Sequence, residues 1–128
     1  MDKLEVFLMA NILAVDDSAS MREMVSFTLK GAGFNVTEAA DGEEALNKAR
    51  SQQFDLVLTD VNMPVMDGIT FIRHLRAEAN YKYTPMLMLT TESAADKKAE
   101  GKAAGATGWI VKPFNPDQLL NTINKVLG

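Results

Sequence analysis

Five short apolar runs recur along the chain, and longer segments of mixed character separate them. The runs are too short for helices, and they lack the strict apolar–polar alternation of a strand with one solvated face. Both properties indicate strands that are buried on both faces of a sheet. The sequence therefore predicts strands at residues 12–15, 34–36, 56–58, 86–89 and 109–111.

The segments between the runs carry signals for helices. Ser18 precedes a segment in which apolar residues repeat at helical spacing, and Gly31 and Gly33 end it. Asp41 and Glu44 have the spacing of a capping box, in which side chains satisfy backbone N–H groups of the first turn. We therefore expect helices after the first and second strands.

Three further helices are predicted in the second half of the chain. One follows Gly68, where apolar residues recur at helical spacing, and another starts at Ser93, with Asp96 in its first turn. The motif at 115–118 combines an N-cap asparagine, a first-turn proline and a capping glutamine. The core-facing residues of this last helix are predicted to be Leu119, Leu120, Ile123 and Leu127.

Strand and helix alternate five times without a linker, an internal repeat or a change in composition. This alternation predicts one α/β domain at residues 10–128, with a doubly wound parallel sheet and helices on both faces. Residues 1–9 precede the pattern as an N-terminal extension, which a tag remnant, an upstream start codon or an extra turn would each explain. In such sheets the functional crevice lies beyond the carboxyl ends of the strands.

Composition narrows the class of protein. The chain of 128 residues has no cysteine, which excludes a disulfide scaffold or a thiolate metal site and fits a reducing compartment. Its net charge of −4 argues against a protein whose main task is to grip nucleic acid. The apolar run at 6–10 is too short for a membrane span or a signal peptide. We therefore expect a soluble, cytoplasmic protein that binds neither nucleic acid nor membrane.

Reactive side chains stand where four of the predicted strands end. Asp16 and Asp17 follow the first strand, and Asp60 follows the third. Thr90 ends the fourth strand, and Lys112 ends the fifth. Because parallel pairing brings these ends to one edge of the sheet, three carboxylates, a hydroxyl and an ammonium are expected to share one cleft.

The charges in this cleft indicate a metal ion. Three carboxylates and Lys112 carry a net charge of −2, which would raise the pKa of at least one carboxylate. A divalent cation would neutralise the cleft, and Mg²⁺ fits best because it prefers oxygen ligands and is usually completed by phosphate. A carboxylate beside Mg²⁺ and a lysine can attack a phosphoryl group and become an aspartyl phosphate.

The same residues lie in four longer motifs, which are VDDS at 15–18, TDVNMPVMDG at 59–68, LTTE at 89–92 and VKPF at 111–114. As a set, these motifs resemble the receiver domains of bacterial two-component response regulators, most of all those of the chemotaxis type. The resemblance covers about residues 10 to 127, which is nearly the whole chain. It implies a flavodoxin-like sheet of strand order 2-1-3-4-5 with five helices.

The resemblance also implies a role for each matching residue of the cleft. Asp60 would be the phosphoacceptor and a ligand of Mg²⁺. Asp17 would bind the metal directly, Asp16 chiefly through water, and Asn62 through its backbone carbonyl. Lys112 would pair with the phosphoryl oxygens.

Further roles concern the switch and its reset. Thr90 would be the switch hydroxyl, while Asn62 and Glu92 would tune the access of hydrolytic water. Trp109 stands at the aromatic switch position, where chemotaxis-type members usually have tyrosine, so we expect altered gain or altered partner contacts. Its ring would either swing inward on phosphorylation or already be wedged inward. The bond between Lys112 and Pro113 resembles the family's cis peptide.

The resemblance implies a monomeric signalling switch rather than an enzyme, although one that phosphorylates itself from a donor and dephosphorylates itself. Because no output domain follows Gly128 in this sequence, we expect action through protein contacts. The implied partners are a CheA-like histidine kinase, the flagellar motor switch and a phosphatase. The alternative within the family is a non-chemotactic phosphorelay intermediate or a phosphate-sink receiver.

Two alternatives from other classes are disfavoured by the sequence. Phosphohydrolases of the haloacid-dehalogenase type carry a second aspartate two residues after the nucleophile, whereas Ser18 and Asn62 occupy those positions here. A flavodoxin would need a hydroxyl-rich loop or a helix N-terminus for the flavin phosphate, whereas the first loop of this chain is acidic.

Overall fold

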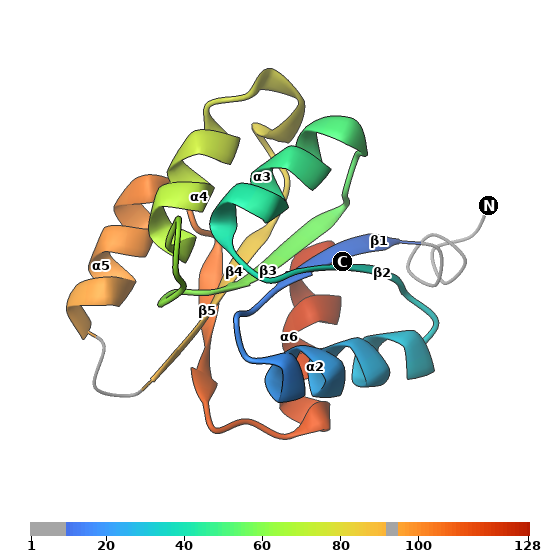
Figure 1. Cartoon of the computed structure of the whole chain (residues 1–128). Helices are drawn as coiled ribbons and strands as arrows, with labels where there is room; N and C mark the ends of the chain where they lie inside the picture. The colour runs from blue at the N-terminus through green and yellow to red at the C-terminus, as the bar shows by residue number, and fades with distance from the viewer. Residues whose placement is uncertain (1–9, 92–94) are drawn as a thin grey trace.

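A five-stranded parallel sheet forms the centre of the computed structural model, which describes residues 10–91 and 95–128 (Figure 1). Its strands are β1 (Asn11–Val15), β2 (Asn35–Ala39), β3 (Leu56–Asp60), β4 (Met86–Thr91) and β5 (Gly108–Lys112). They pair in the order β2-β1-β3-β4-β5, which confirms the doubly wound, flavodoxin-like fold that the resemblance implied. The expectations for residues 1–9 and for a helix start at Ser93 lie outside the described residues.

Helices cover both faces of the sheet. They are α2 (Ala19–Gly31), α3 (Gly42–Ser51), α4 (Gly68–Arg76), the short 3₁₀ helix η1 (Ala79–Tyr81), α5 (Ala95–Ala104) and α6 (Pro116–Leu127). In Figure 1, α2 and α6 lie on one face, and α3, α4 and α5 lie on the other. Within residues 10–91 and 95–128, no helix is long and apolar enough to cross a membrane.

The three central strands send side chains into two hydrophobic clusters, one on each face of the sheet. In β1, Leu13 and Val15 belong to one cluster, whereas Ile12 and Ala14 belong to the other. A strand with two buried faces has no polar side to alternate with, so the continuous apolar pattern correctly predicted β1, β3 and β4.

Strands β2 and β5 are also present where they were predicted, but the expectation of burial on both faces was wrong for them, because they lie at the two edges of the sheet. Most residues of these strands are partly or fully exposed, and Trp109 in β5 keeps 39% of its surface accessible. An edge strand pairs on one side only, so it needs less apolar sequence. Strand β2 also begins one residue later than expected and extends through the polar residues Thr37 and Glu38.

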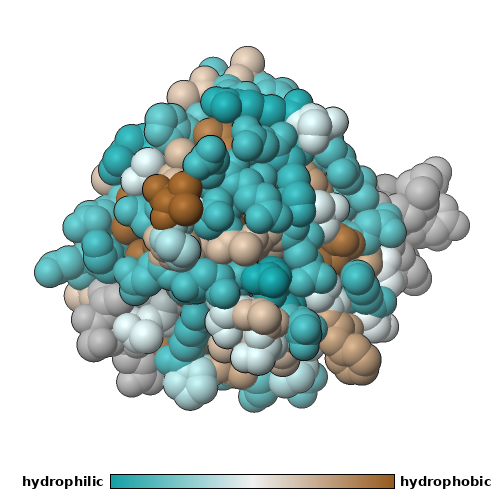
Figure 2. Space-filling view, viewed as in Figure 1, coloured by the Kyte–Doolittle hydropathy of each residue, from teal (hydrophilic) through white to brown (hydrophobic). Residues whose placement is uncertain are grey.

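The predicted caps account for where several helices begin. The Ser18 side chain accepts a hydrogen bond from the backbone N–H of Met21, and that of Asp41 accepts one from the N–H of Glu44. The reciprocal capping box at Asn115 is present in full. The face of the molecule shown in Figure 2 is mainly hydrophilic, and its hydrophobic residues form small separate patches.

Helix η1 was not predicted, because its three residues carry no periodic pattern. Its last residue, Tyr81, is fully buried and anchors the neighbouring chain. The Tyr81 hydroxyl lies 2.7 Å from the carbonyl oxygens of Ala49 and Gln52, and it accepts a hydrogen bond from the N–H of Phe54 at 3.2 Å. The Tyr81 hydroxyl therefore links the end of α3 to the segment that leads into β3.

We expect Tyr81→Phe to lower the free energy of unfolding by about 1–3 kcal/mol, because it leaves buried backbone groups without a partner. Tyr83→Phe is the matched control, since that side chain is 86% exposed and its loss of a hydroxyl should change stability by less than about 0.5 kcal/mol. Urea unfolding followed by circular dichroism measures both values. Equal stability of the two variants would contradict the anchoring role.

Candidate functional site

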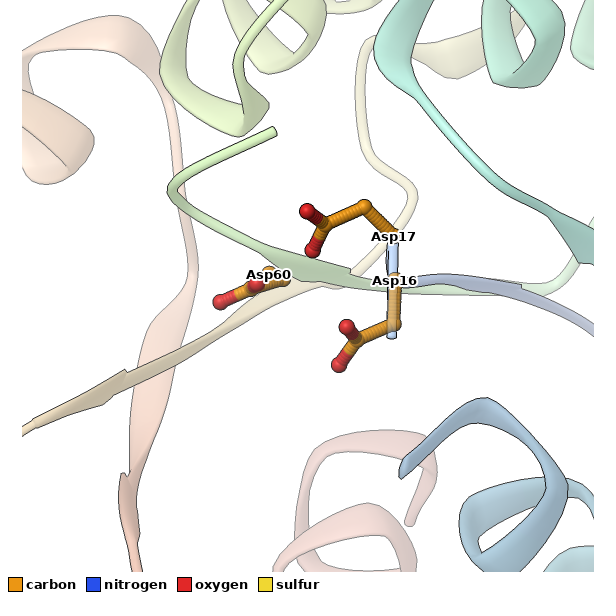
Figure 3. Close-up of side chains that lie close together, drawn as sticks. All are labelled: Asp16, Asp17 and Asp60. Carbon is orange, nitrogen blue, oxygen red and sulfur yellow. The ribbon is translucent and has the colours of Figure 1, made fainter. Parts of the chain in front are cut away.

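Asp16, Asp17 and Asp60 lie together at the carboxyl edge of the sheet (Figure 3). Strands β1 and β3 pair in parallel with Val15 opposite Thr59, so the next residue of each strand, Asp16 and Asp60, lies beside the other. One carboxylate oxygen from each aspartate lies within 4.8 Å of the others. Asp16 is buried, Asp60 is half-buried and Asp17 is exposed, so the cluster opens to solvent on one side.

Lys112 brings a positive charge to the acidic cluster from the end of β5. Its Nζ donates a hydrogen bond to Asp60 Oδ1 at 3.1 Å and lies 3.8 Å from Asp16 Oδ2. The bond between Lys112 and Pro113 is cis, which confirms the expectation drawn from the resemblance. The predicted meeting of three carboxylates and one ammonium is therefore present.

The loop after β3 is held against Asp60 by its main chain. The N–H of Val61 donates to Asp60 Oδ1 at 2.9 Å, and the N–H of Gly68 donates to the carbonyl oxygen of Val61 at 2.9 Å. A Cβ atom on Gly68 would lie 2.0 Å from the Asp60 carbonyl oxygen. Only glycine allows this approach, so Gly68 lets helix α4 begin directly behind Asp60.

Asp16 is the most constrained of the three acids, with 3% of its surface exposed. Its Oδ1 accepts a hydrogen bond from the N–H of Ser18 at 2.9 Å, whereas Oδ2 is buried without a hydrogen-bond partner in the described part of the chain. Burial raises the pKa of Asp16, and the charges of Asp60 and Asp17 raise it further, against the opposing effects of Ser18 and Lys112. A buried carboxylate oxygen without a donor, beside two more carboxylates, fits a hard cation.

A cleft of about 150 Å³ adjoins Asp60 and collects most of the remaining predicted residues. Its lining residues are Asp60, Val61, Asn62, Leu89, Thr90, Thr91, Lys97 and Lys112. Thr90 is 4% exposed, so its side chain lies in the protein interior, in the cleft that Asp60 also lines. Glu92, the other residue expected to tune hydrolysis, lies outside the described residues.

Trp109 does not line this cleft. It lies on β5 beside a separate groove of about 370 Å³ that β5 and α6 form. The ammonium of Lys98, from α5, lies 5.6 Å from the centre of the Trp109 ring. With 39% of its surface exposed, the ring is in an outward position, and the structure does not show the wedged arrangement considered above.

Sequence reasoning missed two residues at the site. Lys97 lines the cleft, and sequence reasoning did not identify it because its distance from β3 is a tertiary property. Arg22 donates from Nη1 to the carbonyl oxygen of Asp16 at 2.6 Å. The signal for Arg22 was its place one helical turn after Ser18, from which a long side chain can reach back to the strand end.

Comparison with known proteins agrees with this geometry. The family model for the response regulator receiver domain matches residues 12–124. The chemotaxis protein CheY of Pseudomonas aeruginosa is 42% identical over 116 residues, which cover 90% of this chain and 94% of that protein.

Solved structures show the same architecture. The chemotaxis response regulator CheY4 of Vibrio cholerae matches with a TM-score of 0.88 and 59% identity, over 92% of this chain and 98% of that one. The receiver domain of a sensor histidine kinase from Pseudomonas aeruginosa, whose active-site cleft coordinates a magnesium ion, matches with a TM-score of 0.87 and 29% identity. That match covers 94% of this chain and 98% of the other.

In buffer without divalent cations, Asp16→Asn is expected to raise the free energy of unfolding at neutral pH. The substitution removes a buried charge that Asp60 and Asp17 repel, and it keeps an oxygen that can accept from Ser18. Because folding raises the pKa of Asp16, the folded protein binds more protons, and the stability of the parent falls as the pH rises through that raised value.

The advantage of Asp16→Asn should therefore shrink as the pH falls toward 3.8, the ordinary value for an aspartate, because the parent becomes neutral at this position as well. Urea unfolding at neutral pH and near pH 4 tests this dependence. Asp117→Asn, on the exposed first turn of α6, is the control and should show no such pH-dependent gain. A loss of stability in Asp16→Asn at neutral pH would show that the cluster is not repulsive.

Proposed function

The chain belongs to the response regulator receiver domain family, and on that premise we propose that Asp60 accepts a phosphoryl group with the help of Mg²⁺ and thereby switches the binding of a partner protein. The observation that carries the proposal is the Asp60 carboxylate, hydrogen-bonded to Lys112 and within 4.8 Å of two further carboxylates. Phosphoryl transfer needs both metal ligands and a cation, and this site supplies three clustered carboxylates and the ammonium of Lys112.

Asp60 is the nucleophile in this proposal. Its Oδ1 already accepts hydrogen bonds from Val61 and Lys112, so we assign the attack on phosphorus to Oδ2. The new bond joins Oδ2 to phosphorus, while the bond from phosphorus to the donor's nitrogen or oxygen breaks and its electron pair leaves with the donor. The Lys112 ammonium then pairs with a phosphoryl oxygen, which offsets the charge brought by the group.

Asp16, Asp17 and Asp60, together with the backbone carbonyl of Asn62, would hold the metal. Bound there, Mg²⁺ supplies positive charge to the phosphoryl oxygens and fixes their orientation. The fit rests on the orphaned Oδ2 of Asp16 and on an all-oxygen donor set. Asn62 lines the cleft beside Asp60, and with Glu92 it would control the approach of the water that later removes the phosphate.

The switch is proposed to run from Thr90 to Trp109. Phosphate on Asp60 would offer an acceptor to the Thr90 hydroxyl, which lines the same cleft. Strands β4 and β5 pair with Thr90 opposite Val111, two residues beyond Trp109. An inward shift of Thr90 would free space on the Trp109 side, and the outward indole is placed to fill it.

The names of the relatives support a chemotaxis role for this chain, with a CheA-like histidine kinase as donor and the flagellar motor switch as target. A phosphatase would be a further partner. The alternative is a phosphorelay or phosphate-sink receiver. Binding of the motor switch protein only after activation would separate the first role from the second, because a phosphate sink has no need of an activated target.

Acetyl phosphate and Mg²⁺ are expected to add one phosphoryl group to the parent and none to Asp60→Asn, since Asp60 is the acid that Lys112 contacts most closely. Intact-protein mass spectrometry measures the added mass, and chelation of Mg²⁺ should suppress it. Asp117→Asn is the matched control and should be labelled like the parent. Full labelling of Asp60→Asn would refute the assignment.

The single tryptophan reports the proposed switch directly. Beryllofluoride with Mg²⁺, which mimics the phosphoryl group, is expected to reduce acrylamide quenching of Trp109 fluorescence in the parent and to leave Thr90→Ala unchanged. Lys98→Met removes a cation–π contact of about 0.5–1 kcal/mol, so it should raise the inward population about two- to fivefold before activation. Quenching that is the same with and without beryllofluoride in the parent would exclude the swing.

A further inference from the structure

Arg22 holds the main chain at the end of β1. Its Nη1 donates to the carbonyl oxygen of Asp16 at 2.6 Å, and its Nε donates to Glu38 Oε1 at 3.2 Å. The Arg22 side chain is 21% exposed, so this geometry is largely shielded from water. One guanidinium therefore bridges a proposed metal ligand and the neighbouring edge strand β2.

Glu38 is itself held on several sides. It lies in β2 opposite Ala14 of β1, and its Oε2 accepts a hydrogen bond from the Ser26 hydroxyl at 3.3 Å. Its backbone carbonyl accepts a hydrogen bond from the ammonium of Lys48. With both carboxylate oxygens engaged, Glu38 fixes the plane of the guanidinium and neutralises its charge.

These contacts complete the support of Asp16. Its N–H donates to the carbonyl oxygen of Ala39 at 3.1 Å, its carbonyl accepts from Arg22, and its Oδ1 accepts from Ser18. The backbone and one carboxylate oxygen are thus fixed by the protein. The remaining Oδ2 lies on the side of Lys112 and the acidic cluster.

We propose that Arg22 and Glu38 are positioning residues for the Mg²⁺ site. Arg22 presets the direction in which Asp16 offers its free oxygen. Glu38 cancels the charge of the guanidinium, so that this cation neither repels Mg²⁺ nor turns toward the carboxylates that must bind it. The inference rests on the proposed Mg²⁺-dependent phosphorylation and adds two residues that lie outside the four motifs of the site.

The sign of one measurement separates positioning from a simple charge effect. Arg22→Gln removes a positive charge near three acids, so an arginine that acted only through its charge would weaken Mg²⁺ binding, and its removal would strengthen it. If Arg22 positions Asp16, the same variant should raise the dissociation constant for Mg²⁺ about tenfold. Isothermal titration of the full chain with magnesium chloride gives this value.

Two further variants test the separate roles of Arg22 and Glu38. Arg22→Lys keeps the charge, but an ammonium lacks the planar fork that reaches both the Asp16 carbonyl and Glu38, so Mg²⁺ binding should remain weak. Glu38→Gln leaves the guanidinium charge without its counter-ion and should also weaken binding. Arg50→Gln is the matched control, because Arg50 forms an ion pair with Glu78 at the same distance of 3.2 Å but at the far end of α3.

The rate at which acetyl phosphate labels Asp60 supplies the second readout. In Arg22→Gln the rate should fall at limiting Mg²⁺ and return to near the parent's at saturating Mg²⁺, whereas general damage to the fold would lower it at both. An unchanged or lower dissociation constant in Arg22→Gln would overturn the inference. So would an equal loss of rate at all Mg²⁺ concentrations.

Failure of this inference is distinguishable from failure of the proposed function. If the parent neither binds Mg²⁺ nor accepts phosphate on Asp60, the proposed function is wrong. If the parent does both and the Arg22 and Glu38 variants match it, only the positioning role is wrong. Circular dichroism checks that each variant is folded. If Arg22→Gln does not fold, Arg22→Lys keeps the test decisive, because it retains the charge and removes only the planar fork.

Discussion

Mutual repulsion among carboxylates at one edge of a parallel sheet is the constraint on which the rest of the structure depends. Asp16 and Asp60 cannot move apart, because Asp16 directly follows β1 and Asp60 ends β3, and the side chains of both strands are buried on both faces. The packing of β1 against β3 thus sets the spacing of the acids. Burial raises the pKa of Asp16, and repulsion from Asp60 and Asp17 raises it further, which Lys112 offsets only in part. A fold with such an edge is prepared to take up positive charge.

The sequence was sufficient to place this edge, and the reason is geometric. Parallel strands end on one side of their sheet, so identifying β1, β3, β4 and β5 was enough to bring Asp60 and Lys112 together. The exposure of the edge strands and the presence of helix η1 were less predictable, because both depend on tertiary neighbours rather than on a periodic pattern. The contact between Arg22 and Asp16 depends on a side-chain direction, which spacing alone can suggest but not establish.

Asp60 and the aromatic residue Trp109 lie on opposite sides of a narrow boundary. Thr90 lies in the cleft beside Asp60, whereas Trp109 lies on the partly exposed strand β5, beside a groove that β5 and α6 form. Only the pairing of β4 with β5 separates the two regions. A change of charge at Asp60 would therefore have a short path to the surface at β5. An indole at this boundary fills more volume than a phenol and has a different hydrogen-bonding group.

The origin of Lys112 has a consequence for how the protein is made. The acids come from β1 and β3, in the first half of the chain, whereas the ammonium that contacts them comes from β5, near the end. Synthesis proceeds from the N-terminus, so the acidic edge emerges before its internal counter-charge exists. Until β5 docks, this acidic edge lacks the ammonium of Lys112. Docking of β5 is therefore the step that brings the Lys112 ammonium to Asp60 and offsets part of the negative charge at this edge.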